Sequence, residues 1–310
     1  MQQQLQNPPN AQNPMRGNLA RIYDRAVEDL GNVVVLEHVN VRVPDQRIAT
    51  IFYVSGLGLT RDPYLMTGVN NMWVNAGRAQ FHLPSGAAQV VRGHTGLVIA
   101  GRAALLERLA SVRELLAGTK FMFIEHEGCV EVICPWGNRI RVFEPQPRVG
   151  RMRLGMPYVE LEVPRGTVDG IARFYKDILG TAASVVEGTH GRSAEAAVGP
   201  GQKLIYRESD TPQPAFDGHH VAIYLADFSG PYKKLLDRGL ITEESDQHQY
   251  RFLDLVDPVT GRVLFTLEHE VRSMRHPMYA RPLVNRNPAQ TNRVYAPGHE
   301  ETAWELSTQE

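Results

Sequence analysis

The polar and apolar positions of this chain repeat one pattern of strand and helix. Residues 38–59 begin with an alternating stretch, pass Pro44 and continue into an amphipathic segment, and residues 158–180 do the same around Pro164. Alternation with a period of two predicts a half-buried strand, whereas apolar positions three and four residues apart predict a helix. The two segments are therefore expected to be copies of one structural unit.

Two shorter pairs of segments repeat in the same order. Residues 93–101 resemble residues 218–226, and residues 137–145 resemble residues 261–269. Strand and helix periods alternate between these landmarks, with Gly-rich and Pro-rich turns separating the strands. The whole pattern predicts four successive β-α-β-β-β units.

The composition of the ends and of the middle of the chain suggests where these units are divided. The N-terminus is rich in Gln, Asn and Pro, with helical spacing only over residues 18–30, and the C-terminal stretch has little periodicity. We expect a disordered N-terminus plus a short helix over 1–32, a first domain of two units over 33–145, a linker over 146–156, a second domain of two units over 157–270 and an extended tail over 271–310. The tail is apolar enough to be ordered by docking, and we expect it to contribute to a homodimer interface.

The overall charge and hydropathy exclude several kinds of partner. With 43% hydrophobic and 22% charged residues and a net charge of −1, the chain has the composition of a globular protein and no basic excess that would favour nucleic acid. No apolar run approaches the ~20 residues that cross a membrane, and the polar N-terminus has no signal-peptide core. We expect a cytoplasmic protein whose partner is a small-molecule substrate, with no nucleic acid and no membrane.

The four units carry motifs that resemble a known superfamily. A Phe-Tyr pair precedes a glycine in the first and third units (Phe52-Tyr53 before Gly58, and Phe174-Tyr175 before Gly180). Together with closing turns of the Asp-Pro-x-Gly-Asn kind, these motifs resemble the vicinal oxygen chelate superfamily, which includes glyoxalase I, bleomycin-resistance proteins and extradiol dioxygenases. The resemblance implies an α+β fold in which four βαβββ modules pair into two open cup-shaped barrels, with a divalent metal ion inside one cup.

The resemblance also implies positions for the metal ligands. In the first domain these positions hold His38, His82 and His94, and the position of the usual glutamate holds Arg141. In the second domain the same positions hold Tyr158, Tyr206, His220 and Phe265, so no metal is expected there. Three imidazoles suit Fe²⁺, Zn²⁺, Mn²⁺ or Ni²⁺ and leave positions open for substrate and water.

Other polar residues on inward-facing strand positions are candidates for binding and catalysis. Arg141 is expected to bind an anionic group of the substrate by a bidentate contact. The remaining candidates are Glu160 and His220 as acid or base groups, and Asn40, Tyr158, His248 and Tyr250 as ligand-binding groups.

Three functions remain open at this level. The leading one is a metal-dependent enzyme, either a ring-cleaving dioxygenase or a glyoxalase-like lyase or isomerase, acting on a small oxygen-rich molecule. The second is a metal-free protein that binds or sequesters a small molecule in cups whose metal sites are degenerate. The third is a purely structural or interaction protein.

Overall fold

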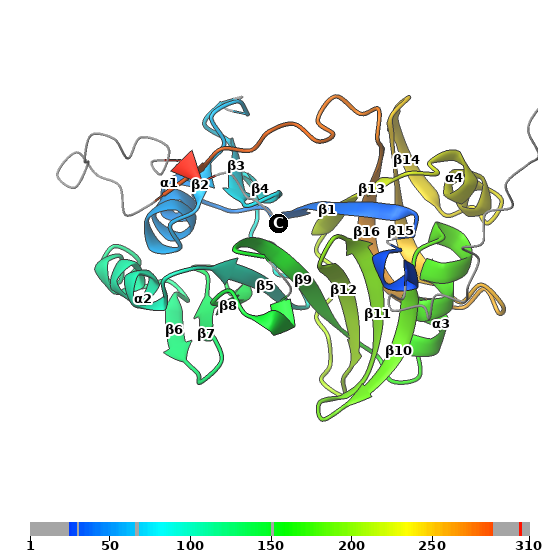
Figure 1. The fold of residues 1–310 in the computed structure, drawn as a ribbon, viewed down its shortest axis with the longest axis horizontal. Coiled ribbons are helices and arrows are strands. Elements are labelled where there is room, and N and C mark those ends of the chain that lie inside the picture. The colour runs from blue at the N-terminus through cyan, green and yellow to red at the C-terminus, as the bar shows by residue number, and fades with distance from the viewer. Residues whose placement is uncertain (1–24, 30, 66–67, 150–151, 288–303, 306–310) are drawn as a thin grey trace, which may run out of the picture.

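The computed structural model describes residues 25–29, 31–65, 68–149, 152–287 and 304–305. Four βαβββ modules are present, as predicted, and their strands form two eight-stranded mixed sheets (Figure 1). The helix expected over residues 18–30 lies mostly outside the described residues, which include only the short 3-10 turn η1 (Arg25–Glu28). The expected disorder of the N-terminus also lies outside them.

One sheet is formed by the first and fourth modules, and we call it the outer cup. Its strands follow the order β14-β15-β16-β13-β1-β4-β3-β2. Their bounds are β1 Val33–Asn40, β2 Thr60–Arg61, β3 Asn71–Ala76, β4 Ala79–Pro84, β13 His220–Leu225, β14 Ile241–Asp246, β15 Gln249–Val256 and β16 Val263–Ser273.

The other sheet is formed by the second and third modules, and we call it the inner cup. Its strands follow the order β10-β11-β12-β9-β5-β8-β7-β6. Their bounds are β5 Gly93–Ile99, β6 Met122–Glu125, β7 Val130–Ile133, β8 Arg139–Phe143, β9 Leu154–Val163, β10 Ala183–Gly188, β11 Gly191–Gly199 and β12 Gln202–Glu208.

The pairing of modules differs from the sequential pairing that we expected. The first strands of the modules form the junctions, β1 antiparallel to β13 and β5 antiparallel to β9. The expectation that modules one and two share a cup, and modules three and four another, is therefore wrong. Its physical reason is that alternation identifies strands locally, whereas the choice of partner edge is made by long-range packing. The division into 33–145 and 157–270 as domains remains a prediction.

Each helix contacts the helix of the neighbouring module in the sequence. Because neighbouring modules belong to different cups, these contacts join the two cups. The helical segment of the first module (α1, Gln46–Ala49, continuing as η2, Thr50–Gly56) contacts α2 (Arg102–Ser111) of the second module. In the third module α3 (Val168–Phe174) continues as η4 (Tyr175–Leu179), and η4 contacts α4 (Ser229–Leu236) of the fourth module. Each half of the chain is thus tied together by helices and to the other half by sheets.

Buried aromatic side chains explain why the repeated Phe-Tyr pairs lie where they do. Phe52 and Tyr53 are fully buried between helix and sheet, and Phe174 and Tyr175 are buried in the same way in the third module. The first helix begins at the N-cap Asp45, whose carboxylate accepts the backbone N–H groups of the first turn. The helices therefore pack apolar side chains against the sheets.

Residues 274–287 follow β16 first as a series of turns and then as coil that includes the short strand β17 (Asn285–Arg286), and we call them the strap (orange in Figure 1). Arg281 of the strap pairs with the fully buried Asp62 at 2.8 Å, and Asn285 bonds both the N–H and the C=O of Gly77. Gly77 has φ 68°, and a Cβ there would lie 2.1 Å from the carbonyl oxygen of Leu154, so the turn requires glycine. The expected docking of the tail is thus seen for these residues, against the same chain, whereas residues 288–303 and 306–310 lie outside the described part.

Candidate metal centre

Three imidazoles meet on the concave face of the outer cup. His38 lies on β1, His82 on β4 and His220 on β13, and one nitrogen atom of each lies within 4.8 Å of the others. The strand register causes this meeting, because Asn40 is opposite both His82 and His220, and His38 precedes Asn40 on the same face. The ring centroid of His38 is 5.5 Å from each of the other two rings.

Neighbouring carboxylates orient two of these rings. The Nδ1 atom of His38 lies 3.0 Å from Glu37, and the Nδ1 atom of His220 lies 3.2 Å from Glu268. In both residues the Nε2 atom is buried and has no hydrogen-bond partner among the described residues. A histidine held through one nitrogen by a carboxylate, with the other nitrogen free, has the arrangement found in metal-ligating histidines.

The third ring is fixed from a different side. The Nε2 atom of His82 lies 2.8 Å from the side-chain oxygen of Asn71, and the ring stacks on Trp73 at a centroid distance of 3.8 Å. The ring is therefore anchored through Nε2, which makes Nδ1 its candidate ligand atom. Both contacts come from β3, the neighbouring strand.

Burial keeps the imidazoles of His38 and His82 neutral. Burial, with a smaller contribution from the charges of the other two histidines, lowers the pKa of His82 to about 2. Burial also lowers the pKa of His38, although its bond to Glu37 acts in the opposite direction. A neutral imidazole has the lone pair that a metal ion requires.

A carboxylate stands next to the cluster. The Oε2 atom of Glu270 on β16 lies 3.5 Å from Nε2 of His220. Its carboxylate also forms ion pairs with Arg251 and Arg272. Burial alone would raise the pKa of Glu270, but its contacts with His220, His38 and Arg272 hold that pKa far below the usual range. Glu270 is therefore ionised, and its charge is shared with two guanidinium groups.

The donor set fits a divalent transition-metal ion. Three converging imidazoles suit Zn²⁺, Fe²⁺ or Ni²⁺, and Glu270 is the carboxylate that approaches the Nε2 atom of His220. The surrounding charged groups are three carboxylates against two guanidinium groups, a balance of −1, which favours a cation: Glu37, Glu268, Glu270, Arg251 and Arg272.

The inner cup holds a different set of side chains at the equivalent positions. By strand register these are Tyr158 for His38, Ile205 for His82, His94 for His220 and Arg141 for Glu270. The Nε2 atom of His94 lies 3.2 Å from the hydroxyl group of Tyr158, and burial lowers the pKa of His94 to about 4. One imidazole with a phenol, an aliphatic chain and a guanidinium group does not form a metal site.

This distribution corrects the predicted ligand set. His38 and His82 meet as expected, but the third imidazole is His220, and His94 lies in the other cup. The sequence placed His94 with His38 only because consecutive modules were expected to share a cup. The apparent loss of the family's glutamate has the same origin, since Arg141 belongs to the inner cup and Glu270 supplies the carboxylate of the outer one.

Two other assumed positions also change. Tyr206 is fully buried on the opposite face of its strand and its hydroxyl group contacts that of Tyr175 at 2.6 Å, so Ile205 occupies the inward position. On β16 the residue opposite His220 is Glu268. Phe265 lies three residues earlier, nearer the start of the strand. Glu268 and Glu270 were missed, although their alternation around His269 is the sequence signal of an inward-facing carboxylate pair.

The polar candidates of the inner cup form ion pairs. Glu160 makes a bidentate pair with Arg207 at 2.9 and 3.0 Å, and Arg141 bonds Glu131 at 3.2 Å. Burial alone would raise the pKa of Glu160, but Arg207 and His94 lower it below its ordinary value. Arg141, Tyr158 and Glu160 line a cavity of about 890 Å³. The shared inner cup thus brings Arg141, which we expected beside the metal ligands of the first domain, together with Tyr158 and Glu160, and all three lie apart from the imidazole cluster.

The last candidates lie in three different places. Asn40 lies on the cluster's face, and its side-chain oxygen is buried without a hydrogen-bond partner among the described residues. His248 lies in the turn between β14 and β15, not in a strand. Tyr250 is buried against Phe228 and Tyr232, beside α4, so it faces away from the cup. Asn40 thus has a place at the candidate centre, and Tyr250 does not.

Known structures share the overall fold of the chain. The chain is similar to glyoxalase I from Zea mays, with 14% identity, a TM-score of 0.55 and coverage of 78% of this chain and 93% of that one. It is also similar to a suggested dioxygenase from Bacillus subtilis subsp. subtilis str. 168, with 16% identity, a TM-score of 0.53 and coverage of 79% and 86%. The protein therefore has the fold of the vicinal oxygen chelate superfamily, as its sequence motifs predicted.

Comparison at the level of sequence adds no closer relative. No family model matches the chain, and no curated protein matches it. None of the helices in the described part of the chain is long and apolar enough to cross a membrane.

Proposed function

We propose that the protein is a divalent-metal-dependent enzyme that acts on a small molecule with two neighbouring oxygen atoms. The observation that carries this proposal is the convergence of three anchored imidazoles, in which the Nε2 atom of His38 has no hydrogen-bond partner among the described residues and that of His220 faces the carboxylate of Glu270 at 3.5 Å. When bound there, the metal ion supplies Lewis-acid polarisation of substrate oxygens. His38, His82 and His220 would hold it, with Glu270 beside them.

The chain's own groups would bind and orient the substrate. The unpaired oxygen of Asn40 is a hydrogen-bond acceptor on the same face as the cluster, and it suits a substrate hydroxyl group. Ion pairs with Arg251 and Arg272 hold the carboxylate of Glu270 in place. This arrangement leaves Glu270 as a fixed negative charge next to His220, able to stabilise positive charge that develops nearby.

Two reaction types remain within this proposal. A ring-cleaving dioxygenase consumes O₂ with every turnover, whereas a glyoxalase-like lyase or isomerase does not. The known structures that share the fold include both a glyoxalase I and a suggested dioxygenase. Oxygen uptake with catechols in the presence of Fe²⁺, compared with anaerobic turnover of α-oxoaldehyde adducts, separates the two.

The test of the metal proposal is direct. Freshly purified protein is analysed by inductively coupled plasma mass spectrometry, and the metal-free protein is titrated with Co²⁺ while its visible absorption is recorded. We expect close to one metal ion per chain and a Co²⁺ spectrum that is lost in His38→Ala. Protein that binds no Co²⁺ at micromolar concentrations would overturn the proposal.

One observation favours the metal-free alternative. Arg251 and Arg272 already neutralise much of the charge of Glu270, and their guanidinium groups repel an incoming cation. A protein that binds a small molecule without metal is therefore the second candidate. It predicts no metal in the purified protein and no effect of chelators on ligand binding. A homodimer and a cytoplasmic location remain predictions in either case.

A further inference from the structure

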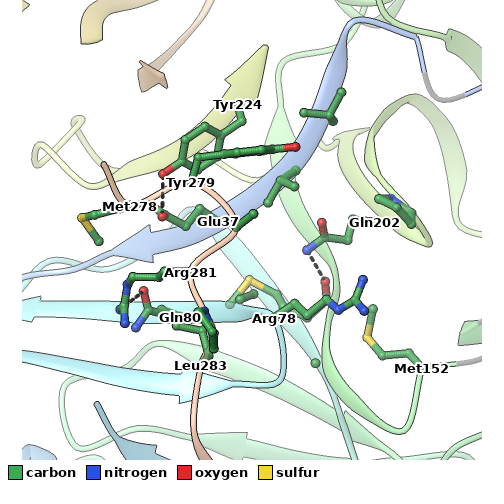
Figure 2. A pocket seen from close by; sticks show the side chains of 18 of the residues that line it. Glu37, Arg78, Gln80, Met152, Gln202, Tyr224, Met278, Tyr279, Arg281 and Leu283 are labelled. Carbon is green, nitrogen blue, oxygen red and sulfur yellow. Dashed lines mark hydrogen bonds between the residues drawn. The ribbon is translucent and has the colours of Figure 1, made fainter. Parts of the chain in front are cut away.

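A second cavity lies behind the imidazole cluster, beneath the strap. It has a volume of about 770 Å³, within the range of small-molecule sites. Figure 2 shows that Met278, Tyr279, Arg281 and Leu283 of the strap lie along one side of it. The other walls come from β1, the start of β4, β9, the start of β12 and Tyr224 of β13, and none of the three clustered histidines lines it.

The lining of this cavity is suited to a largely apolar molecule. Aliphatic, aromatic and thioether side chains make up most of the wall, among them Val35, Met152, Leu154, Met156, Met278 and Leu283. Methionine side chains are flexible and polarisable, so they adapt to flat or irregular ligands. No single fixed shape is therefore imposed on the occupant.

Several polar groups in the wall are already paired within the protein. Gln202 bonds the carbonyl groups of Leu36 and Met156, while the Nη2 atom of Arg281 pairs with Asp62 and bonds Gln80. The charge of Arg281 is thus compensated, and its Nε and Nη1 atoms, which have no hydrogen-bond partner among the described residues, are left to donate to a neutral acceptor. A charged ligand would have to break such pairs or remain uncompensated in an apolar site, which is costly. The occupant that fits best is neutral.

One residue of the wall touches the candidate metal centre. Glu37 lines the cavity, accepts a hydrogen bond of 2.8 Å from the hydroxyl group of Tyr224, and lies 3.0 Å from Nδ1 of His38 (Figure 2 shows the bond to Tyr224). It also pairs with Arg272, the partner of Glu270. A molecule that moves Tyr224 or Glu37 therefore changes how His38 is held.

We propose that this cavity binds a neutral, largely apolar small molecule, and that its occupancy alters the metal affinity of the imidazole cluster through Glu37. The binding site itself does not depend on the proposed function, whereas the coupling rests on it. Coupling between two sites is reciprocal, so the metal ion must change the affinity of the cavity by the same factor.

Binding is tested with the neutral fluorescent probe N-phenyl-1-naphthylamine. Val35→Trp and Leu283→Trp fill the cavity from the sheet and from the strap, and Val186→Trp, on an exposed position of β10, is the matched control. We expect saturable binding at one site per chain, weakened at least about tenfold by either filling variant and unchanged in the control. Non-saturable binding, or wild-type affinity in both folded filling variants, overturns the site.

Coupling is tested by titrating the metal-free protein with Co²⁺, with and without saturating probe. We expect the Co²⁺ dissociation constant to differ at least about threefold between the two titrations, a modest allosteric coupling. Tyr224→Phe, which removes the bond to Glu37 on the cavity side, should reduce this ratio towards one. Equal dissociation constants overturn the coupling. Absence of any Co²⁺ binding overturns the coupling and the proposed function together, while probe binding still decides the cavity.

Discussion

His38 and His220 come from the first and the fourth modules, yet their imidazole rings lie 5.5 Å apart in the outer cup. The antiparallel pairing of β1 with β13 brings them together and excludes His94 of the second module. The candidate centre is therefore assembled only when the two ends of the repeat have met. Metal binding would stabilise the long-range pairing that creates the site, because it favours the folded state alone.

The first prediction separates the two possible third ligands. His220→Ala should weaken Co²⁺ binding by more than about 100-fold, because losing a ligand costs at least as much as losing its supporting partner. His94→Ala is the matched control and should bind Co²⁺ as the wild type does, since His94 faces the inner cup. Titration followed by visible absorption measures both. Loss of Co²⁺ binding in His94→Ala with unchanged binding in His220→Ala would mean that the first and second modules share a cup.

The second prediction concerns the support of His82. Asn71→Ala removes the oxygen that holds Nε2 of this ring and should weaken metal binding by about 10-fold or more. The neighbouring Asn70 is exposed and contributes only a backbone contact, so Asn70→Ala should change nothing. If both variants bind Co²⁺ equally well, His82 is not a ligand through Nδ1.

The third prediction concerns the buried pair between Arg281 of the strap and Asp62. Arg281→Met leaves the carboxylate of Asp62 buried without its cation and should lower the free energy of unfolding by about 3 kcal/mol. The double variant Asp62→Asn/Arg281→Met removes both charges and should lose less than the sum of the single variants. Urea unfolding of the four proteins measures the coupling.

The same pair gives a pH dependence with a defined sign. Burial alone would raise the pKa of Asp62, but the bond from Arg281 and two backbone N–H groups hold it below its ordinary value of 3.8. Stability from a lowered carboxyl pKa is present above the ordinary value and is lost as the pH falls through the folded value. The difference between wild type and Arg281→Met should therefore be full at neutral pH and shrink below about pH 4. A constant difference down to pH 3 would contradict it.

The sequence predicted the modules but not their partners. Strand alternation, the N-cap at Asp45 and the buried Phe52-Tyr53 pair are local signals, so four units and their helices could be recognised from the chain. The choice of partner for β1, which is β13 and not a strand of the second module, produces no periodic pattern in the sequence. This choice depends on how complete units pack against one another. His38 and His82, from one module, were therefore placed together correctly.

The carboxylate was missed for a related reason. In the second module Arg141 follows soon after the hairpin glycine, and the same offset in the fourth module leads to Phe265. The β15–β16 hairpin contains irregular register positions, and β16 continues to Ser273, so the inward positions opposite β13 fall later, at Glu268 and Glu270. An offset counted from a turn fails where a strand is longer or bulged.

The last prediction tests the strap as a whole. Truncation after Ser273 removes the partners of Asp62, Asn75 and Gly77, all of which bond to residues 281–285. Buried polar groups left without partners are costly, so the melting temperature should fall by at least about 5 °C, a shift of a few kcal/mol for a chain of this size. Truncation after Asn287 keeps these bonds and serves as the control. Differential scanning calorimetry, with the mass in solution measured by sedimentation, separates loss of the intrachain strap from loss of a dimer contact. An unchanged melting temperature after Ser273 would mean that the strap adds nothing to stability.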